Sequence, residues 1–311
     1  MGLKFFDLFA GIGGFRLGME RAGHECIGSC EWDKYARETY KKNFGSYPEY
    51  DDAKDLHPES LTYFDVLCAG FPCQAFSIAG KRLGFEDTRG TIFFEIARIA
   101  KEKRPPYLFL ENVRGLLSHD KGRTFDTIIS TLDEMGYDAE WQVLNSKYFV
   151  PQNRERIFIV GHSRDSSSRK IFPLGDFDSE TNQSKSKEKV GVVNDKGTLR
   201  GVENSTCIDS NYWKGCDNHA QRTLIYTAQV NQNMKQKVQT RDNTWTLSTS
   251  ANDFGVMEGQ RIRRLMPIEC ERLQGFPDNW TIGSDTQRYK QCGNAVTVNV
   301  VEYIAKELRL G

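Results

Sequence analysis

The sequence predicts an α/β domain built around a parallel sheet, followed by a smaller and irregular domain. In residues 1–161, short apolar runs alternate with stretches whose apolar residues recur at helical spacing. Several runs are apolar throughout, which is typical of a sheet that helices cover on both faces. After Gly161 the chain is rich in Ser, Asn, Asp, Lys and Gln, which indicates exposed loops. The predicted strands are residues 5–9, 26–30, 65–71, 107–110 and 157–160.

Helices are expected between these strands and at the end of the chain. One helix begins near Ile92 and must end before Pro105, because proline cannot continue it. A second surrounds Ile128, and a last helix around Val301 is expected to pack back on the first domain. We therefore divide the chain into residues 1–161, 162–260 and 261–311.

Length and composition restrict the class of protein. The chain has 311 residues, which suits one large domain and one smaller domain. No apolar run approaches the ~20 residues that span a bilayer, and the first residues lack the basic start of a signal peptide. We therefore expect a cytoplasmic protein with no membrane partner. The 42 basic and 42 acidic residues balance, so any DNA-binding surface must come from local clustering.

The eight cysteines do not predict a metal site. Cys26 and Cys30 are four residues apart, but no second pair and no nearby histidine complete a zinc set. We interpret both as ordinary buried thiols of a reducing compartment.

A glycine-rich turn follows the first predicted strand. Residues 10–14 read AGIGG, and a helical pattern follows. Strand, glycine turn and helix let the backbone approach a ligand at a helix N-terminus, although a tight structural turn explains the same pattern. Glu31 is placed to bind ribose hydroxyls, Trp32 to stack on an adenine ring, and Asp52 to accept from its amino group. No GxxxxGK[ST] loop is present, which argues against a nucleoside triphosphate.

Cys73 follows the strand at 65–71 directly. Ligands of open α/β sheets bind beyond the carboxyl ends of the strands, where a cysteine is well placed to act as a nucleophile. For an isolated cysteine, a buried structural thiol is the usual explanation. Residues 75–90, however, contain three glycines together with Lys81, Arg82 and Arg89. A flexible basic loop of this kind fits closure over a polyanion.

Glu111 follows the strand at 107–110, and therefore lies at the same sheet edge as Cys73. A cysteine beside a carboxylate suits attack on a ring that needs hydrogen bonding or protonation, whereas a helix N-terminal charge is the alternative for Glu111. Arg154 and Arg156 alternate with Glu155 and are expected on one face, which fits a phosphate, a carboxylate or a base carbonyl. A solvated charged edge is the alternative for these arginines.

Together these motifs resemble the cytosine-C5 DNA methyltransferase family in its compact bacterial or phage form. They occur in the order of the family and cover both ends of the chain, and only residues 162–245 lack a family-wide pattern. At position 266 the chain has Met where many relatives have Thr. The matching segments are DLFAGIGG (7–14), EWD (31–33), GFPCQAFS (70–77), ENV (111–113), QNRER (152–156), RRLMPIECERLQGFPD (263–278) and GNAV (293–296).

The resemblance implies a Rossmann-like methyltransferase sheet and roles for individual residues. Cys73 would attack C6 of cytosine, Glu111 would bind N3 and the exocyclic amine, Arg156 would hold O2, and Arg154 would support this site. DNA contacts are expected from Gln74, Ser77, Lys81 and Arg82. The residues expected around S-adenosylmethionine are Phe9, Gly11, Ile12, Gly13, Gly14, Glu31, Trp32, Asp52, Pro72, Ile92, Asn294 and Ala295.

The implied reaction is methyl transfer to C5 of a cytosine that is flipped out of double-stranded DNA. The segment before Arg261 would read the DNA sequence, including residues 206–215 and 243–250, and the bases it reads are not deduced. We expect a monomer, with a restriction endonuclease of the same recognition site as a candidate partner. Two alternatives stay open: a transfer-RNA cytosine-C5 methyltransferase of the same fold, and a non-catalytic DNA-binding protein on this scaffold. About eighty loop-rich residues favour DNA, and the intact Cys73, Glu111 and Arg156 favour an enzyme.

Overall fold

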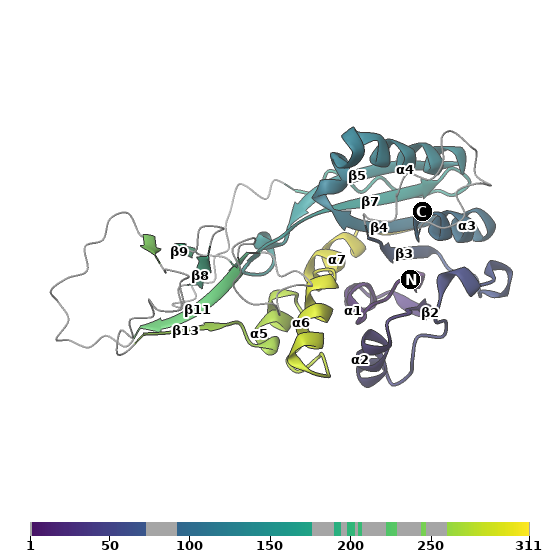
Figure 1. Ribbon diagram of the computed structural model, residues 1–311. Coiled ribbons are helices and arrows are strands. Elements are labelled where there is room, and N and C mark those ends of the chain that lie inside the picture. Colours follow the sequence, from purple (N-terminus) through teal and green to yellow (C-terminus); the bar gives the residue numbers. More distant parts are fainter. Residues whose placement is uncertain are drawn as a thin grey trace. The chain divides into compact units, whose positions relative to one another are not determined.

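A computed structural model of the chain describes residues 2–72, 92–175 and 265–310, and the backbone of six strands between positions 190 and 264. The chain forms two compact units (Figure 1). The first consists of residues 1–145, 155–176 and 295–311, and the second of residues 146–154 and 177–294. The chain therefore leaves the first unit twice and returns to it twice. The expected division into functional domains, with boundaries after residues 161 and 260, stays a prediction.

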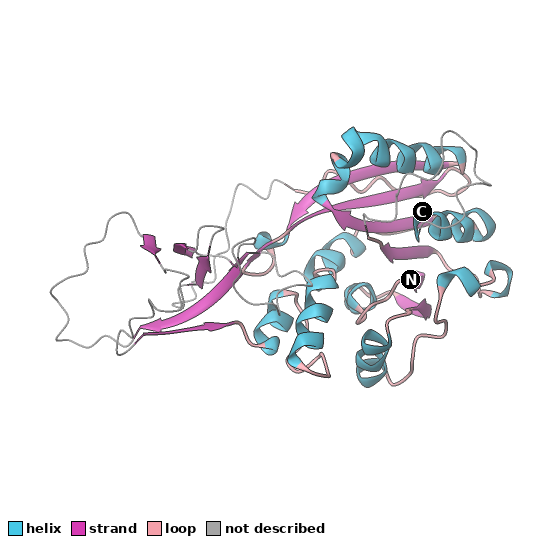
Figure 2. Ribbon diagram, viewed as in Figure 1, coloured by secondary structure: helices cyan, strands magenta, loops and turns pink. Residues whose placement is uncertain are grey.

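A six-stranded sheet in the order β2-β1-β3-β4-β7-β5 forms the centre of the first unit (Figure 2). The first four strands are parallel, whereas β7 runs antiparallel to β4 and to β5. The expected α/β sheet is present. The prediction that all of its strands are parallel is wrong for β7, which runs antiparallel to both of its neighbours. The strands are β1 (Lys4–Leu8), β2 (Glu25–Cys30), β3 (Val66–Gly70), β4 (Tyr107–Val113), β5 (Tyr137–Asn145) and β7 (Glu155–Ser163). The helices of this unit are α1 (Gly14–Arg21), α2 (Lys34–Phe44), α3 (Ile92–Lys103), α4 (Arg123–Glu134) and α7 (Val298–Ala305), with short 3-10 turns η1 (Ala53–Asp55), η2 (Pro58–Ser60), η4 (Arg114–Leu117) and η5 (His119–Gly122).

Alternate residues of the central strands face two separate layers of helices. Leu67 and Leu108 share one buried cluster with Ile96 of α3 and Ile128 of α4. On the other face, the ring of Phe109 meets Phe15 of α1 edge-on, with centroids 5.1 Å apart. Because both faces are covered, the central strands contain almost only apolar residues, and this composition made them predictable.

The last helix returns to the first unit, as expected. α7 packs against α1, and a Cβ added to Gly18 of α1 would lie 2.6 Å from Cγ1 of Val301. This approach is close enough to require glycine, since real Cβ atoms are not found at such distances. The two helices, far apart in the sequence, lie side by side in Figure 1.

The second unit contains an antiparallel sheet where the composition indicated loops. Its five strands have the order β12-β9-β8-β11-β13, and a two-stranded parallel ladder joins β10 to β6. These strands have at most seven residues, so they leave little periodicity in the sequence. The elements are η6 (Ser146–Tyr148), β6 (Gln152–Asn153), β8 (Val190–Val193), β9 (Thr198–Val202), β10 (Ser205–Thr206), β11 (Arg222–Ala228), β12 (Thr244–Thr246), β13 (Gln260–Arg264), α5 (Pro267–Leu273) and α6 (Asp285–Asn294).

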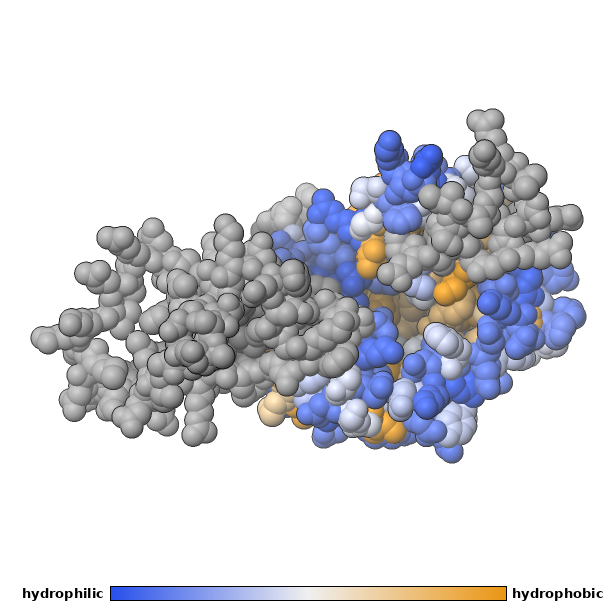
Figure 3. Space-filling model, viewed as in Figure 1, coloured by the Kyte–Doolittle hydropathy of each residue, from blue (hydrophilic) through white to orange (hydrophobic). Residues whose placement is uncertain are grey.

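The surface of the described residues shows no sign of a membrane span. None of the described helices is both long and apolar enough to cross a bilayer. Hydrophilic residues dominate the face seen in Figure 3, and hydrophobic residues on it lie in several separate areas.

Candidate active site

The strand order reverses between β1 and β3. From β1 the chain continues to β2 on one side of the sheet and then to β3 on the other side. In open α/β sheets, ligands bind beyond the carboxyl ends of the strands at such a switch point. The glycine turn follows the end of β1, and Phe71 and Pro72 follow the end of β3. Both predicted functional segments therefore begin at this crevice.

The two central glycines of the turn are needed for different reasons. Gly11 and Gly13 have φ of 56° and 86°, in the left-handed region that favours glycine. A Cβ on Gly13 would lie 2.2 Å from the Phe44 ring of α2, so packing requires glycine at this position. A Cβ on Gly11 would meet nothing within 4 Å. Gly11 therefore borders open space, which a ligand can use to approach the backbone.

Glu31, which directly follows β2, is hydrogen-bonded to this turn. Its Oε2 accepts from the backbone N–H of Gly11 at 2.7 Å, and its Oε1 accepts from the N–H of Asp33 at the same distance. The side chain is buried, and this burial raises the pKa of Glu31. A carboxylate oxygen can accept more than one hydrogen bond, which suits the hydroxyl groups of a ribose. The neighbouring Trp32 is 76 % exposed and presents a free ring face.

The remaining predicted cofactor residues fall into three groups. Phe9 is partly buried with φ of 64°, Ile12 is buried, and Gly14 begins α1. Asp52 is exposed and accepts from the N–H of Lys54 at 3.0 Å, Pro72 is exposed, and Ile92 begins α3. Asn294 is the exposed last residue of α6 in the second unit, whereas Ala295 belongs to the first unit.

Glu111 and Arg156 meet at the ends of β4 and β7. Oε1 of Glu111 lies 3.1 Å from Nε of Arg156, with 12 % and 15 % of the respective side chains exposed. The antiparallel pairing brings this contact about, because Val113 pairs with Arg156 in the ladder. On the other side of the acid is Gly70 of β3, where an added Cβ would lie 3.4 Å from Oε2 of Glu111. The structure thus brings together two of the predicted catalytic residues, with a glycine beside them.

Arg154 lies in the second unit, although it is only two residues from Arg156. Its side chain is buried, and Nη2 donates to the carbonyl oxygen of Gly293 at 3.1 Å. It stands between β6 and β7 rather than inside either strand. The alternation that predicted a common face for both arginines therefore does not apply to one continuous strand.

Asn112 belongs to the matching segment ENV (111–113), but the sequence predicted no role for it. Its side chain is buried, and Nδ2 donates to the carbonyl oxygen of Phe71 at 2.9 Å. Its Oδ1 accepts from the N–H of Val113 at 2.8 Å. An amide directly after a predicted acid at a strand end is the pattern that could have identified it.

Several predicted residues lie outside the described part of the chain, which resumes at Ile92. These are the nucleophile and the proposed DNA contacts of the following loop: Cys73, Gln74, Ser77, Lys81 and Arg82.

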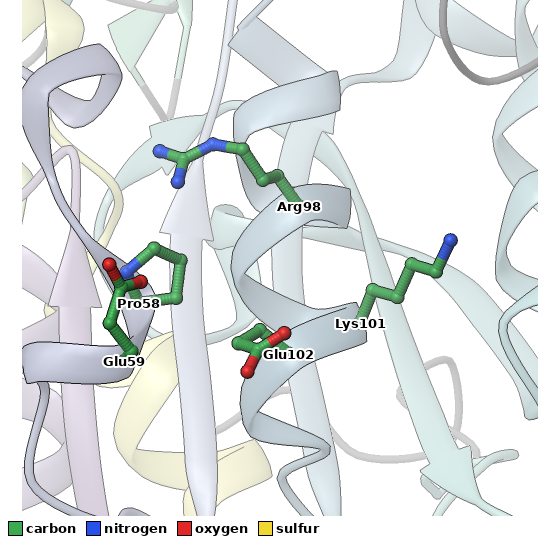
Figure 4. A pocket seen from close by; sticks show the side chains of 5 residues that line it. All are labelled: Pro58, Glu59, Arg98, Lys101 and Glu102. Atoms are coloured by element: carbon green, nitrogen blue, oxygen red, sulfur yellow. The ribbon is translucent and has the colours of Figure 1, made fainter.

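Other features of the described residues do not coincide with this edge. A cavity of about 530 Å³ lies between η2 and α3 (Figure 4), and none of the predicted site residues lines it. Among residues 2–72, 92–175 and 265–310, no group of three His, Cys, Asp or Glu could hold a metal ion. Cys30 is a buried free thiol, and burial raises its pKa to about 12. The figure shows Pro58, Glu59, Arg98, Lys101 and Glu102 around the cavity.

Comparison with known proteins gives one consistent result. The family model described as C-5 cytosine-specific DNA methylase matches residues 3–309. The chain is 40% identical to the Type II methyltransferase M.HhaI of Haemophilus parahaemolyticus, over 98% of this chain and 93% of that protein. It is 39% identical to the Type II methyltransferase M.HpaII of Haemophilus parainfluenzae, over 98% of this chain and 88% of that protein.

Solved structures share the fold at lower sequence identity. A DNMT2 of Spodoptera frugiperda superposes with a TM-score of 0.69 at 18% identity, over 98% of both chains. A putative DNA modification methyltransferase from an Escherichia coli prophage has a TM-score of 0.59 at 20% identity, again over 98% of both chains.

Proposed function

The chain belongs to the C-5 cytosine-specific DNA methylase family, and on this premise we propose that Cys73, Glu111 and Arg156 carry out its reaction. The protein is a DNA (cytosine-5-)-methyltransferase that acts on a specific DNA sequence, and its methyl donor is S-adenosylmethionine. The proposal concerns the residues and their roles. The observation that supports it most is the contact between Glu111 and Arg156 at the switch-point edge of the sheet.

The glycine turn and its neighbours fit the methyl donor. Gly11 borders open space, the carboxylate oxygens of Glu31 can accept more than one hydrogen bond, and Trp32 has an exposed ring. We assign the ribose hydroxyls to Glu31, the adenine ring to Trp32 and the adenine amino group to Asp52. The bound donor supplies an electrophilic methyl group. The other residues in this set are Phe9, Ile12, Gly13, Gly14, Pro72, Ile92, Asn294 and Ala295.

Cys73 makes the target carbon reactive. Carbon 5 of cytosine is a poor nucleophile, and addition of the Cys73 thiolate to C6 converts the ring into an enamine whose C5 can attack the methyl group, with S-adenosylhomocysteine as the leaving group. After transfer, C5 loses its proton to a base and the electrons of that bond expel the Cys73 thiolate. The ring is then restored and carries the methyl group at C5.

Glu111 and Arg156 hold the ring while this happens. In this assignment Glu111 binds N3 and the exocyclic amine, and Arg156 binds O2 of the same ring. The ion pair fixes both groups before the substrate arrives, so little reorganisation is required during the reaction. Arg154 is assigned a supporting role.

The remaining residues are assigned to contacts with the DNA. A stacked base is out of reach, so the cytosine must be flipped out at a cost of a few kcal/mol. We assign contacts in the opened duplex to Gln74, Ser77, Lys81 and Arg82, and sequence reading to residues 162–260, with residues 261–311 completing the catalytic domain. A monomer in the cytoplasm, with a restriction endonuclease of the same recognition site as its partner, completes the proposal.

Three measurements test this assignment. Wild type should transfer tritiated methyl groups from S-adenosylmethionine to duplex DNA, and a preference for transfer RNA would overturn the assignment of DNA as the substrate.

Cys73→Ser should abolish transfer and retain cofactor binding, and a near-normal rate would exclude the covalent step. DNA with 5-fluorocytosine at the recognition site should form a stable adduct with wild type and none with Cys73→Ser, because C5 can no longer lose a proton.

A further inference from the structure

Phe71 is held from two sides by consecutive residues of β4. Its N–H donates to the carbonyl oxygen of Glu111 at 3.3 Å, and its carbonyl oxygen accepts from Nδ2 of Asn112 at 2.9 Å. The first contact continues the β3–β4 ladder, in which Gly70 pairs with Glu111. The second contact comes from a side chain and extends the connection past the last paired residue of β3.

The orientation of the Asn112 amide is fixed by both of its ends. Nδ2 faces a carbonyl oxygen, which can only accept, and Oδ1 faces the N–H of Val113, which can only donate. A flipped amide would place two acceptors together at one end and two donors together at the other. The two hydrogen bonds therefore determine which atom of the Asn112 amide is nitrogen and which is oxygen. With only 1% of the residue exposed, water cannot replace a lost contact.

Proline at position 72 limits the backbone directly after Phe71. Pro72 fixes its φ and restricts the residue before it, and Cys73 follows. The carbonyl that Asn112 holds is therefore the last backbone acceptor before Pro72 and the nucleophile. Asn112 also stands next to Glu111 in the chain, so one strand end connects the acid with the segment that leads to the thiol.

We propose that Asn112 is a positioning residue for the methyl transfer, which fixes the carbonyl group of Phe71, and with it the entry to Pro72, relative to Glu111. This inference rests on the proposed function. The reaction requires the thiol at C6 and the acid at N3 of the same ring, and their separation must be held closely. A misplacement of 1 Å can reduce a rate about 100-fold.

Two variants separate this role from a structural role. Asn112→Leu has a similar size and no donor, and we expect its single-turnover methyl transfer to be about 100-fold slower than wild type, with unchanged Kd for S-adenosylmethionine and duplex DNA. In Asn112→Asp the introduced carboxyl donates only when protonated. Its rate relative to wild type should therefore be highest at low pH and decrease as the pH rises, whereas the ratio for Asn112→Leu should not depend on pH.

Tyr137→Phe is the matched control. Tyr137 is also buried in the first unit and donates to a backbone carbonyl at 2.9 Å, that of Pro105, which precedes β4 at the end opposite Asn112. This variant should lose stability and keep its rate well below the unfolding midpoint. If the Asn112 variants behave in the same way, or if neither of them folds, Asn112 serves the fold alone and the inference is wrong. An inactive wild type would instead contradict the proposed function.

Discussion

Oε1 of Glu111 and Nε of Arg156 lie 3.1 Å apart at the ends of two antiparallel strands. The antiparallel direction of β7 is what makes this contact possible, because it brings the first residues of β7 beside the last residues of β4. A parallel strand would place its first residues at the opposite edge of the sheet. The departure from a wholly parallel sheet therefore places Arg156 beside Glu111.

Replacing Glu111 with Gln tests the acid without changing its size. The variant cannot give or take a proton at this position, and we expect methyl transfer to slow by about 10²–10⁴-fold. Tritium incorporation into duplex DNA measures the rate. Asp138→Asn is the control, since Asp138 pairs with Arg164 on the surface, and it should transfer methyl groups at the wild-type rate. Equal rates for both variants would remove Glu111 from the mechanism.

The two glycines of the turn should respond differently to alanine. Gly13→Ala forces a methyl group into the Phe44 ring and strains a left-handed residue, so we expect a loss of about 3 kcal/mol in the free energy of unfolding. Gly11→Ala has room and should cost about 1 kcal/mol for its conformation alone. Its main effect should be a higher Kd for S-adenosylmethionine, because the methyl group occupies the open side of the turn. Urea unfolding and calorimetric titration measure the two effects, and a larger loss of stability in Gly11→Ala than in Gly13→Ala would contradict the prediction.

Asp7 should make the stability of the protein depend on pH. Its side chain is fully buried and its Oδ2 accepts from the N–H of Arg16, and burial raises its pKa to about 8. A carboxyl with a raised pKa stabilises the fold most at a pH below its unfolded pKa near 4, and this contribution is lost as the pH rises to 8. Between pH 5.5 and 8 this loss amounts to about 3 kcal/mol, at 1.36 kcal/mol per pKa unit.

Asp7→Asn has no proton to lose and keeps an acceptor for Arg16. Urea unfolding of both proteins at pH 5.5 and 8 should therefore show the variant gaining stability relative to wild type at the higher pH. A difference between the two proteins that stays constant over this range would show that Asp7 does not titrate there.

Glu271 should be a stability determinant of the second unit. It is fully buried and accepts from the N–H groups of Trp280 and Thr281, at 3.2 and 2.9 Å, and from Nη2 of Arg288 at 2.9 Å. Glu271→Ala leaves the guanidinium and both N–H groups without their acceptor, which we expect to cost about 3–5 kcal/mol. The exposed pair of Arg272 and Asp278 supplies the control, because Arg272→Gln should cost at most about 1 kcal/mol. Unfolding curves that coincide for the two variants would refute this prediction.

The part of the fold that is buried on both sides was predictable. The central strands β1, β3 and β4 each contain a run of apolar residues, and each was expected within a few positions of its actual limits. β5 was missed, since an edge strand with one covered face mixes polar and apolar residues, and Trp141 of this strand is 45 % exposed. The direction of a strand could not be predicted from the sequence either, because an apolar run has the same composition in either direction.

The site was predictable where a motif marks a strand end. The glycine turn, Glu111 and Arg156 follow from such motifs, and the structure brings the last two together. No role was predicted for Asn112, because its contact with Phe71 joins residues that are 41 positions apart in the chain. The position of Arg154 in the second unit could not be foreseen either, since no composition change separates it from Arg156. The roles of Cys73 and the loop that follows it stay predictions.

The path of the chain between the two units limits how relatives can exchange parts. Residues 177–294 look like one continuous insert that recombination could transplant with two junctions. Residues 146–154 belong to the same unit, however, and they interrupt the first unit between β5 and β7. A chimera that exchanges only the longer piece would combine a foreign insert with the native residues 146–154. A complete exchange of the second unit therefore requires both pieces to be transferred together.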